Sequence, residues 1–308
     1  MRKFLCALLA LLCLITGATA EGGTFRAGTG AARLGDSLFF AIDEGQTDAL
    51  VRVAADKPML ATRAEGLDSL LTRGNQLYYL EKTDAAWALM RRGETTVPEV
   101  VYAFDAGVEV RALSEYGSDL FLLVDDQLHI LYPDQKLCLR LASAKMKAYV
   151  VVGEYAYFIS ATDIVRYEVN SAAIDAGCLY RLNLSTGNTS LLIKAGVSDL
   201  QCHADTLYFH NLSDAYIRAD GGLSGYLYAF DCATETLKRA LSDYDWSYCP
   251  IDEGLLAYRE GAVVLVGADG TEIDVCETGA QAEVFFADGE IFVYDPDAAS
   301  FAAYPQTR

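Results

Sequence analysis

Short segments in which apolar and polar residues alternate follow one another along almost the whole chain, and turn residues separate them. The segments are rich in Leu, Val, Tyr and Phe and are bounded by Gly, Asp and Asn, a pattern that predicts β-strands. They are most regular in residues 177–209, where we expect strands at 178–184, 189–194, 197–203 and 206–211. Because no long window has the apolar period of a helix, the pattern predicts an all-β protein.

One combination of a turn and an apolar or aromatic strand recurs at intervals of about 36 to about 51 residues. It occurs at 35–40, 74–79, 117–122, 153–158, 204–209, 252–257 and 288–293. Self-similarity in this range indicates a repeat architecture such as a propeller or a solenoid. Since each repeat divides into short strands, the pattern predicts a β-propeller with four-stranded blades.

We expect a seven-bladed β-propeller, with six or eight blades as alternatives. The predicted blades are 29–63, 67–105, 108–141, 146–194, 197–241, 244–276 and 280–304, the last without an outermost strand. Residues 22–28 are expected to supply that missing strand, because closing the ring removes an exposed sheet edge. Residues 21–308 would then form a single β-propeller domain.

The repeat is most specific at residues 178–192 (CLYRLNLSTGNTSLL) and 226–237 (YLYAFDCATETL). On these residues the chain resembles the bacterial secreted β-propeller domains of unknown function that are likened to the low-density-lipoprotein-receptor-related propeller. The resemblance extends over nearly the whole chain after its N-terminal leader. It implies the propeller fold and no particular activity.

The N-terminus has the organisation of a secretory signal peptide. Arg2 and Lys3 precede an apolar run at 4–15, and Ala18-Thr19-Ala20 follows as a cleavage site. The run is too short for a comfortable membrane span. We therefore expect residues 1–20 to be a signal peptide, and the mature protein to be secreted, in the extracellular space or cell envelope, without membrane insertion.

The chain is acidic, with a formal net charge of −19. This charge argues against nucleic acid as a partner, because phosphate contacts need Lys and Arg. Beyond the leader the cysteines are Cys138, Cys178, Cys202, Cys232, Cys249 and Cys276. An even number in a secreted chain predicts disulfides, and free thiols are the alternative.

The sequence offers little catalytic or metal-binding chemistry. The GxSxG, HExxH and P-loop patterns are absent, and the only histidines are His129, His203 and His210. Gly28-Thr29-Gly30 begins like a dinucleotide-binding motif but lacks the third glycine and the following helix. We expect no cofactor, no metal and no catalytic residue.

Two insertions depart most from the repeat, at 160–177 and 211–225. Both fall between the second and third strands of neighbouring predicted blades, so we expect two loops on one face of the ring. Loops on a rigid scaffold are where binding residues concentrate. With Trp246 of the next blade, the predicted ligand-binding residues are Arg166, Tyr167, Tyr216, Arg218, Asp220 and Trp246.

These features favour a monomeric binding or interaction module, and an extracellular protein or a glycan is the expected partner. One alternative is a propeller-scaffold glycan hydrolase or lyase that uses carboxylates of the central channel. A structural domain of an envelope assembly is another. Tolerated surface insertion remains open as the explanation of the two long loops.

Overall fold

The computed structural model describes residues 25–26, 30–44, 47–55, 57–84, 86–169, 172–217, 223–240, 247–259, 261–267, 269–278, 282–287, 290–295 and 300–305. The expected signal peptide lies outside these residues. So do Arg218, Asp220 and Trp246 of the expected binding site. The described chain is nearly all β, as expected, and its one helical element is the 3-10 turn η1 (Pro133–Gln135).

The strands form a series of antiparallel meanders in chain order. The first sheet contains β2 (Ala31–Leu34), β3 (Ser37–Asp43), β4 (Asp48–Ala54) and β5 (Lys57–Ala64). The second contains β6 (Gly66–Arg73), β7 (Gln76–Thr83), β8 (Ala86–Arg92) and β9 (Glu99–Ala103).

A 10-stranded sheet follows, because two long strands each join one meander to the next. It begins with β10 (Val110–Tyr116), β11 (Asp119–Val124), β12 (Gln127–Tyr132) and the long β13 (Leu137–Val152). It continues with β14 (Tyr155–Val169), β15 (Ala172–Asn183) and the long β16 (Thr189–His203). It ends with β17 (Thr206–Ile217), β18 (Leu223–Asp231) and β19 (Thr236–Arg239).

The last two sheets have four strands each. One contains β20 (Ser247–Ile251), β21 (Gly254–Arg259), β22 (Ala262–Gly267) and β23 (Glu272–Glu277). The other contains β1 (Phe25–Arg26), β24 (Glu283–Ala287), β25 (Glu290–Asp295) and β26 (Ser300–Pro305).

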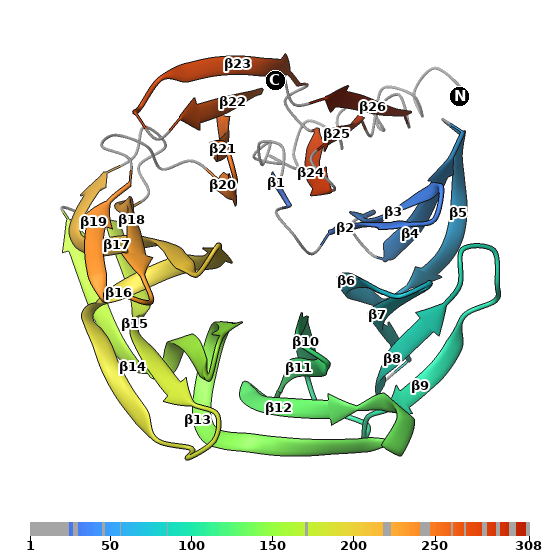
Figure 1. The fold of residues 1–308 in the computed structure, drawn as a ribbon, viewed down its shortest axis with the longest axis horizontal. Helices are drawn as coiled ribbons and strands as arrows, with labels where there is room; N and C mark the ends of the chain where they lie inside the picture. Colours follow the sequence, from blue (N-terminus) through green and yellow to red (C-terminus); the bar gives the residue numbers. More distant parts are fainter. Residues whose placement is uncertain are drawn as a thin grey trace, which may run out of the picture.

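The sheets stand around a common centre, with their first strands innermost (Figure 1). Hydrophobic clusters of the described residues lie between successive four-stranded units, where strand faces rich in Leu, Tyr and Phe meet. A further cluster packs the first sheet against the last, with Phe40 against Phe285 and Phe292. An ion pair of 2.9 Å between Arg33 and Glu290 joins the same two sheets.

The N-terminal strand does not occupy the expected place. β1 pairs in parallel with β24, at the inner edge of the last sheet, whereas β26 forms its outer edge. Residues 22–28 were expected at that outer edge, so this detail of the prediction is wrong. A two-residue parallel pairing at the inner edge leaves the outer edge of β26 without a strand beyond it among the described residues.

Turn chemistry explains where the inner hairpins form. Gly35, Gly74, Gly117 and Gly153 each have a positive φ between the first and second strand of a unit, a conformation that costs a glycine little. The corresponding turn at Ala204 and Asp205 has positive φ at both central residues, as a type I′ hairpin requires. The predicted recurring turns are therefore hairpin turns.

The described cysteines are free, so the disulfide expectation is not met and the alternative of free thiols holds. Cys249 and Cys276 lie together in the cluster between the last two sheets, where they pack as small apolar side chains. Burial raises the pKa of Cys249 to about 12. Such a thiol is poorly reactive because the thiolate is the nucleophile.

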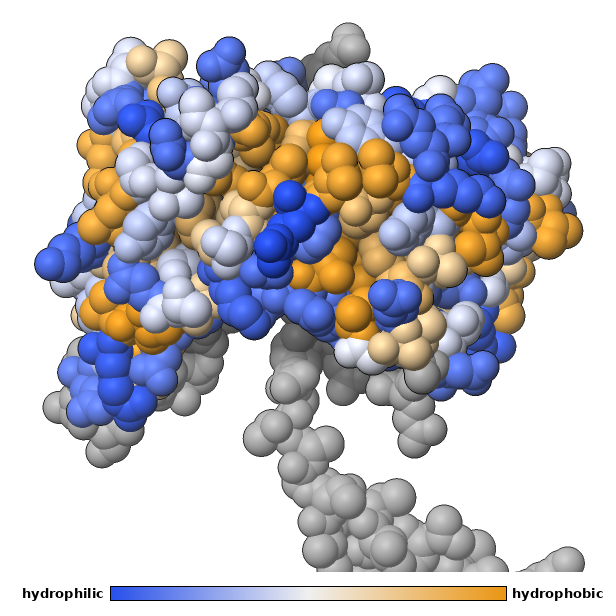
Figure 2. All heavy atoms as spheres, turned by 90° about the horizontal axis from the view of Figure 1, so that it is seen from below, coloured by the Kyte–Doolittle hydropathy of each residue, from blue (hydrophilic) through white to orange (hydrophobic). Residues whose placement is uncertain are grey.

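Large apolar side chains are exposed mainly on the outer strands of the units. Examples are Leu60 on β5, Val100 on β9, Leu139 on β13 and Ile273 on β23. Figure 2 shows apolar patches interspersed with polar groups on the rim that faces the viewer. No helix formed by the described residues is long and apolar enough to cross a membrane.

Candidate functional site

The two predicted insertions are extensions of the sheet rather than loops. β14 and β15 stay paired beyond the body of the unit, from Ile164 opposite Gly177 to Val169 opposite Ala172. β17 and β18 do the same with Tyr216 opposite Ser224 and Ile217 opposite Leu223. We call these extensions the first hairpin (164–177) and the second hairpin (216–224). In Figure 2 a polar lobe projects beyond the disc on the side where β14 and β15 lie in Figure 1.

The first hairpin begins at a specific irregularity in the ladder. Residues 160–163 lie opposite Cys178 alone, so β14 bulges there. The buried Ser160 hydroxyl accepts hydrogen bonds from the backbone N–H groups of Thr162 and Asp163, at 3.1 and 2.8 Å. On the returning strand, a Cβ at Gly177 would lie 1.9 Å from the Ser160 carbonyl oxygen. Only glycine therefore allows β15 to approach the bulge.

The second hairpin has the same base. Residues 212–215 lie opposite Gly225 alone, and the buried Asn211 side chain accepts a hydrogen bond of 2.9 Å from the N–H of Ser213. A Cβ at Gly225 would lie 2.1 Å from the Asn211 carbonyl oxygen. The two bulges thus share a capping polar side chain and a facing glycine.

An aspartate–tyrosine contact completes each base. The Tyr180 hydroxyl donates to Asp163 over 2.6 Å, and this carboxylate raises the pKa of Tyr180 to about 12. At the second base the Tyr228 hydroxyl donates to Asp214 over 3.3 Å, and Arg239 pairs with the same carboxylate at 2.5 Å. Each hairpin is therefore fixed to its sheet by side-chain as well as backbone bonds.

Two of the expected binding residues lie on the first hairpin. Arg166 is exposed and is held between Glu168, at 2.6 Å, and Asp175, at 3.3 Å. The Tyr167 hydroxyl accepts a hydrogen bond of 2.7 Å from the backbone N–H of Gly196 on β16. Tyr167 thereby ties the hairpin to the next strand, while Arg166 presents a charge to solvent.

Tyr216 of the second hairpin packs against Tyr226, with ring centroids 4.9 Å apart. The Arg239 guanidinium lies over Tyr226 at 3.8 Å, a cation–π distance. The structure thus groups Tyr216 with side chains of its own sheet. Tyr248 follows Trp246 by two residues at the start of β20. It is buried, and its hydroxyl donates to the carbonyl of Asp199.

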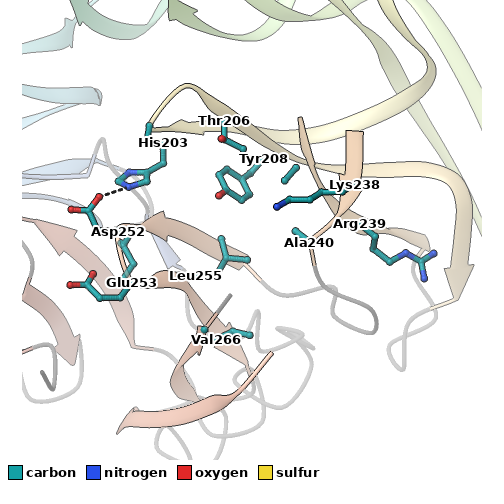
Figure 3. A pocket seen from close by; sticks show the side chains of 15 residues that line it. His203, Thr206, Tyr208, Lys238, Arg239, Ala240, Asp252, Glu253, Leu255 and Val266 are labelled. Atoms are coloured by element: carbon teal, nitrogen blue, oxygen red, sulfur yellow. Dashed lines mark hydrogen bonds and ion pairs between the residues drawn. The ribbon is translucent and has the colours of Figure 1, made fainter. Parts of the chain in front are cut away.

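A cavity of about 440 Å³ lies at the end of β17 opposite to the second hairpin, between the β17–β19 and β20–β22 faces. Its apolar surface includes Ile251, Leu255 and Val266, which are buried. Figure 3 shows Lys238 on one wall and Asp252 and Glu253 on the opposite wall, with Thr206 and Tyr208 between them. Arg239 points away from the cavity.

The two histidines of this region have separate partners. His203 Nε2 lies 2.9 Å from Asp252 Oδ1 at the cavity, whereas His210 Nδ1 lies 3.0 Å from Asp199 Oδ2. The His210 ring also packs edge-on against Tyr248, 5.4 Å between centroids. The described residues contain no group of three or more His, Cys, Asp or Glu side chains that could hold a metal ion.

No protein-family model and no curated protein matches this sequence. Solved structures do. The chain is similar to the β-propeller domain of the Trilobed protease from Pyrococcus furiosus, with 11% identity, a TM-score of 0.53 and coverage of 90% of this chain and 91% of that chain. The fold is that of a β-propeller.

The chain is also similar to two further solved structures. One, from a nidogen/laminin complex, has 12% identity and a TM-score of 0.50 over 88% of this chain and 97% of that one. The other is the extracellular domain of a one-component system protein from B. thetaiotaomicron, with 12% identity and a TM-score of 0.60. This match spans 93% of the present chain but only 38% of the B. thetaiotaomicron chain. At these identities the likeness concerns the fold alone.

Sequence inspection located the insertions but missed what fixes them. The missed signal is a repeated motif: Ser160-Ala161-Thr162-Asp163 with Gly177-Cys178-Leu179-Tyr180, and Asn211-Leu212-Ser213-Asp214 with Gly225-Tyr226-Leu227-Tyr228. In both, the aspartate follows the capping residue by three positions and the tyrosine follows the glycine by three. The repetition identifies the bases of both hairpins.

Proposed function

We propose that this β-propeller is a secreted binding module that holds an extracellular protein or a glycan with its two hairpins. The repeated base is the observation that supports this function. Two buried polar caps, two close glycine approaches and two aspartate–tyrosine bonds orient the hairpins. A surface insertion that is merely tolerated needs no such defined base, since exposed loops are readily lengthened.

The side chains presented there suit a macromolecular partner. Arg166, Glu168 and Asp175 form an exposed charged group on the first hairpin, and Tyr and Arg are common in binding surfaces. The sequence-based prediction adds Arg218, Asp220 and Trp246, which lie outside the described residues. The predicted N-terminal signal peptide supports an extracellular or cell-envelope location.

We further propose seven blades in a ring closed by side-chain packing. Seven hydrophobic clusters among the described residues, one between each pair of neighbouring units, support this count. The cluster around Phe40 and the Arg33–Glu290 ion pair support closure between the first and last blades. A rigid ring gives the hairpins a fixed platform.

The test is an unbiased screen of the mature chain against surface proteins and glycans, followed by hairpin variants. In one variant, residues 216–224 are replaced by a two-residue Asn-Gly turn, which suits a β-hairpin. In a matched variant, Arg166 is changed to Glu. We expect both to weaken capture of the partner at least tenfold while the thermal unfolding midpoint changes little.

Lys57→Glu is the control for the charge change, because Lys57 is exposed on β5 of the first sheet, across the ring from both hairpins (Figure 1). It should leave binding as in the wild type. Unchanged binding by both hairpin variants would disprove the proposed surface.

A further inference from the structure

A second site lies outside the hairpins. We propose that the cavity between β17–β19 and β20–β22 binds a small zwitterion, a molecule with an ammonium and a carboxylate group such as a free α-amino acid or a short peptide with free ends. This site is independent of the proposed function, because it lies at the opposite end of β17 from the second hairpin. Thr206 begins that strand at the cavity and Ile217 ends it at the hairpin.

The cavity has the size and shape of a small-molecule site. The volume of about 440 Å³ falls within the range of small-molecule sites, about 300–1,000 Å³. Two walls come from different sheets, so the cavity is a wedge between rigid faces rather than a gap in a loop. Leu255 and Val266 are buried and apolar, which suits the hydrocarbon part of a ligand.

Opposite charges line the two facing walls of the cavity. In Figure 3 Lys238 extends from β19 toward Tyr208, and Asp252 and Glu253 stand on the facing turn between β20 and β21. Neither Lys238 nor Glu253 forms an ion pair with another described side chain. The nearby Asp231 carboxylate accepts hydrogen bonds from the N–H groups of Ala233 and Thr234, at 2.9 and 2.8 Å, and these bonds, with a smaller contribution from the charge of Lys238, lower its pKa.

Arg239, the neighbouring basic residue, is engaged elsewhere. Arg239 belongs to the same strand, but its side chain points away from the cavity (Figure 3). Its guanidinium pairs with Asp214 and lies over Tyr226. The cationic wall is therefore Lys238, and the acidic wall is the Asp252–Glu253 pair, in which His203 orients Asp252 through a contact of 2.9 Å.

Opposite charges on facing walls select a ligand that carries both. An anion alone would meet Asp252 and Glu253, and a chain of net charge −19 repels anions at long range. A ligand that carries only a positive charge would be repelled by Lys238. A zwitterion places its carboxylate at Lys238 and its ammonium at the acidic turn. The Thr206 and Tyr208 hydroxyls lie between these walls, where they can bond to peptide or carboxylate oxygens.

The experiment is titration calorimetry of the full mature chain with four probes. L-Leucine and Leu-Leu carry both charges, N-acetyl-leucine lacks the ammonium, and leucinamide lacks the carboxylate. We expect at least one of the two zwitterions to bind, and each singly charged probe to bind at least tenfold more weakly. The zwitterion that binds more tightly reports whether the site takes an amino acid or a peptide.

Variants assign the walls. Lys238→Met should weaken zwitterion binding at least tenfold, and so should Glu253→Gln, while Lys145→Met should have no effect. Thermal unfolding checks that each variant is folded, and the variant with the shortened second hairpin should bind the zwitterion as the wild type does. The proposal is wrong if neither zwitterion binds, if a singly charged probe binds equally well, or if folded Lys238→Met keeps full affinity.

Discussion

Single glycines decide whether the two hairpins can leave their sheets. In Gly177→Ala the new methyl group would collide with the Ser160 carbonyl oxygen, 1.9 Å away, and this backbone atom cannot move aside as a flexible side chain can. We expect an unfolding free energy lower by about 3 kcal/mol, as for other overpacked sites, and a similar loss for Gly225→Ala. Urea unfolding measures both. Gly267→Ala is the control, because its methyl group would lie 3.0 Å from the movable Asp269 carboxylate and at an ordinary contact distance of 3.7 Å from the Thr271 carbonyl oxygen. Equal losses in all three variants would contradict this explanation.

Another residue-scale prediction concerns Asp199 and acid stability. The hydrogen bond from His210, opposed by burial, lowers the pKa of Asp199. A carboxylate whose pKa is lowered in the folded state stabilises the fold at pH values above its unfolded pKa of about 3.9. This stabilisation is lost as the pH falls through the pKa of the folded state. Asp199→Asn should therefore lose less stability than the wild type between pH 6 and pH 3. Because the Asp199 side chain is 62% exposed, we expect the difference to stay below about 1 kcal/mol. Identical pH profiles from urea unfolding would show that this pair does not contribute.

At the scale of the element, Tyr167 couples the first hairpin to β16. Its hydroxyl accepts from the Gly196 N–H, and a Cβ at Gly196 would lie 2.7 Å from the Tyr167 ring. Tyr167→Phe keeps the ring but removes the acceptor, at a cost of about 1 kcal/mol for one hydrogen bond. We expect faster amide exchange at Gly196 and faster proteolysis within residues 164–177, with little change in global stability. Tyr180→Phe, at the base of the same hairpin, should leave Gly196 exchange unchanged. A protected Gly196 amide in Tyr167→Phe would rule out the coupling.

Elements were predictable where the cause is local. The alternation of apolar residues and the turn chemistry of Gly35, Gly74 and the Ala204-Asp205 pair located the inner strands. The insertions were expected as loops because they depart from the repeat between the second and third strands of their predicted blades. They form strands because Gly177 and Gly225 admit a close approach to carbonyl groups distant in sequence. Contacts of that kind leave no local pattern, so only the repeated motif could have revealed them.

On the scale of the whole molecule, the repeat predicted the order of the sheets but not the position of β1. Both edges of the last sheet offer unpaired backbone groups, and a two-residue segment has no apolar alternation that selects one edge. The candidate cavity was also invisible in the sequence. It combines residues of β17 and β19 with residues of the β20–β21 turn, and only the packing of two sheets brings them together.

The packing of the first sheet against the last makes a testable prediction about the ring. Phe40 is fully buried and contacts Phe285, Phe292 and Phe301, with ring centroids 5.1, 5.4 and 4.5 Å apart. Phe40→Ala should cost about 3–5 kcal/mol, the usual range for a buried phenylalanine. If this cluster joins the two ends of the ring, the loss of stability should be concentrated in the first and last sheets. Amide exchange should then rise in β2–β3 and β24–β26 before it rises elsewhere, because local opening follows the weakest interface.

Phe209→Ala is the matched comparison. Phe209 is equally buried, but it packs between the units formed by β13–β16 and β16–β19. Phe209→Ala should raise amide exchange in β14–β18 and leave the amides of β24–β26 protected. The same exchange pattern in both variants, or protected β24–β26 amides in Phe40→Ala, would mean that the terminal sheets do not depend on each other. Opposite patterns would show that side-chain packing, without a continuous ladder of hydrogen bonds, unites the first and last sheets.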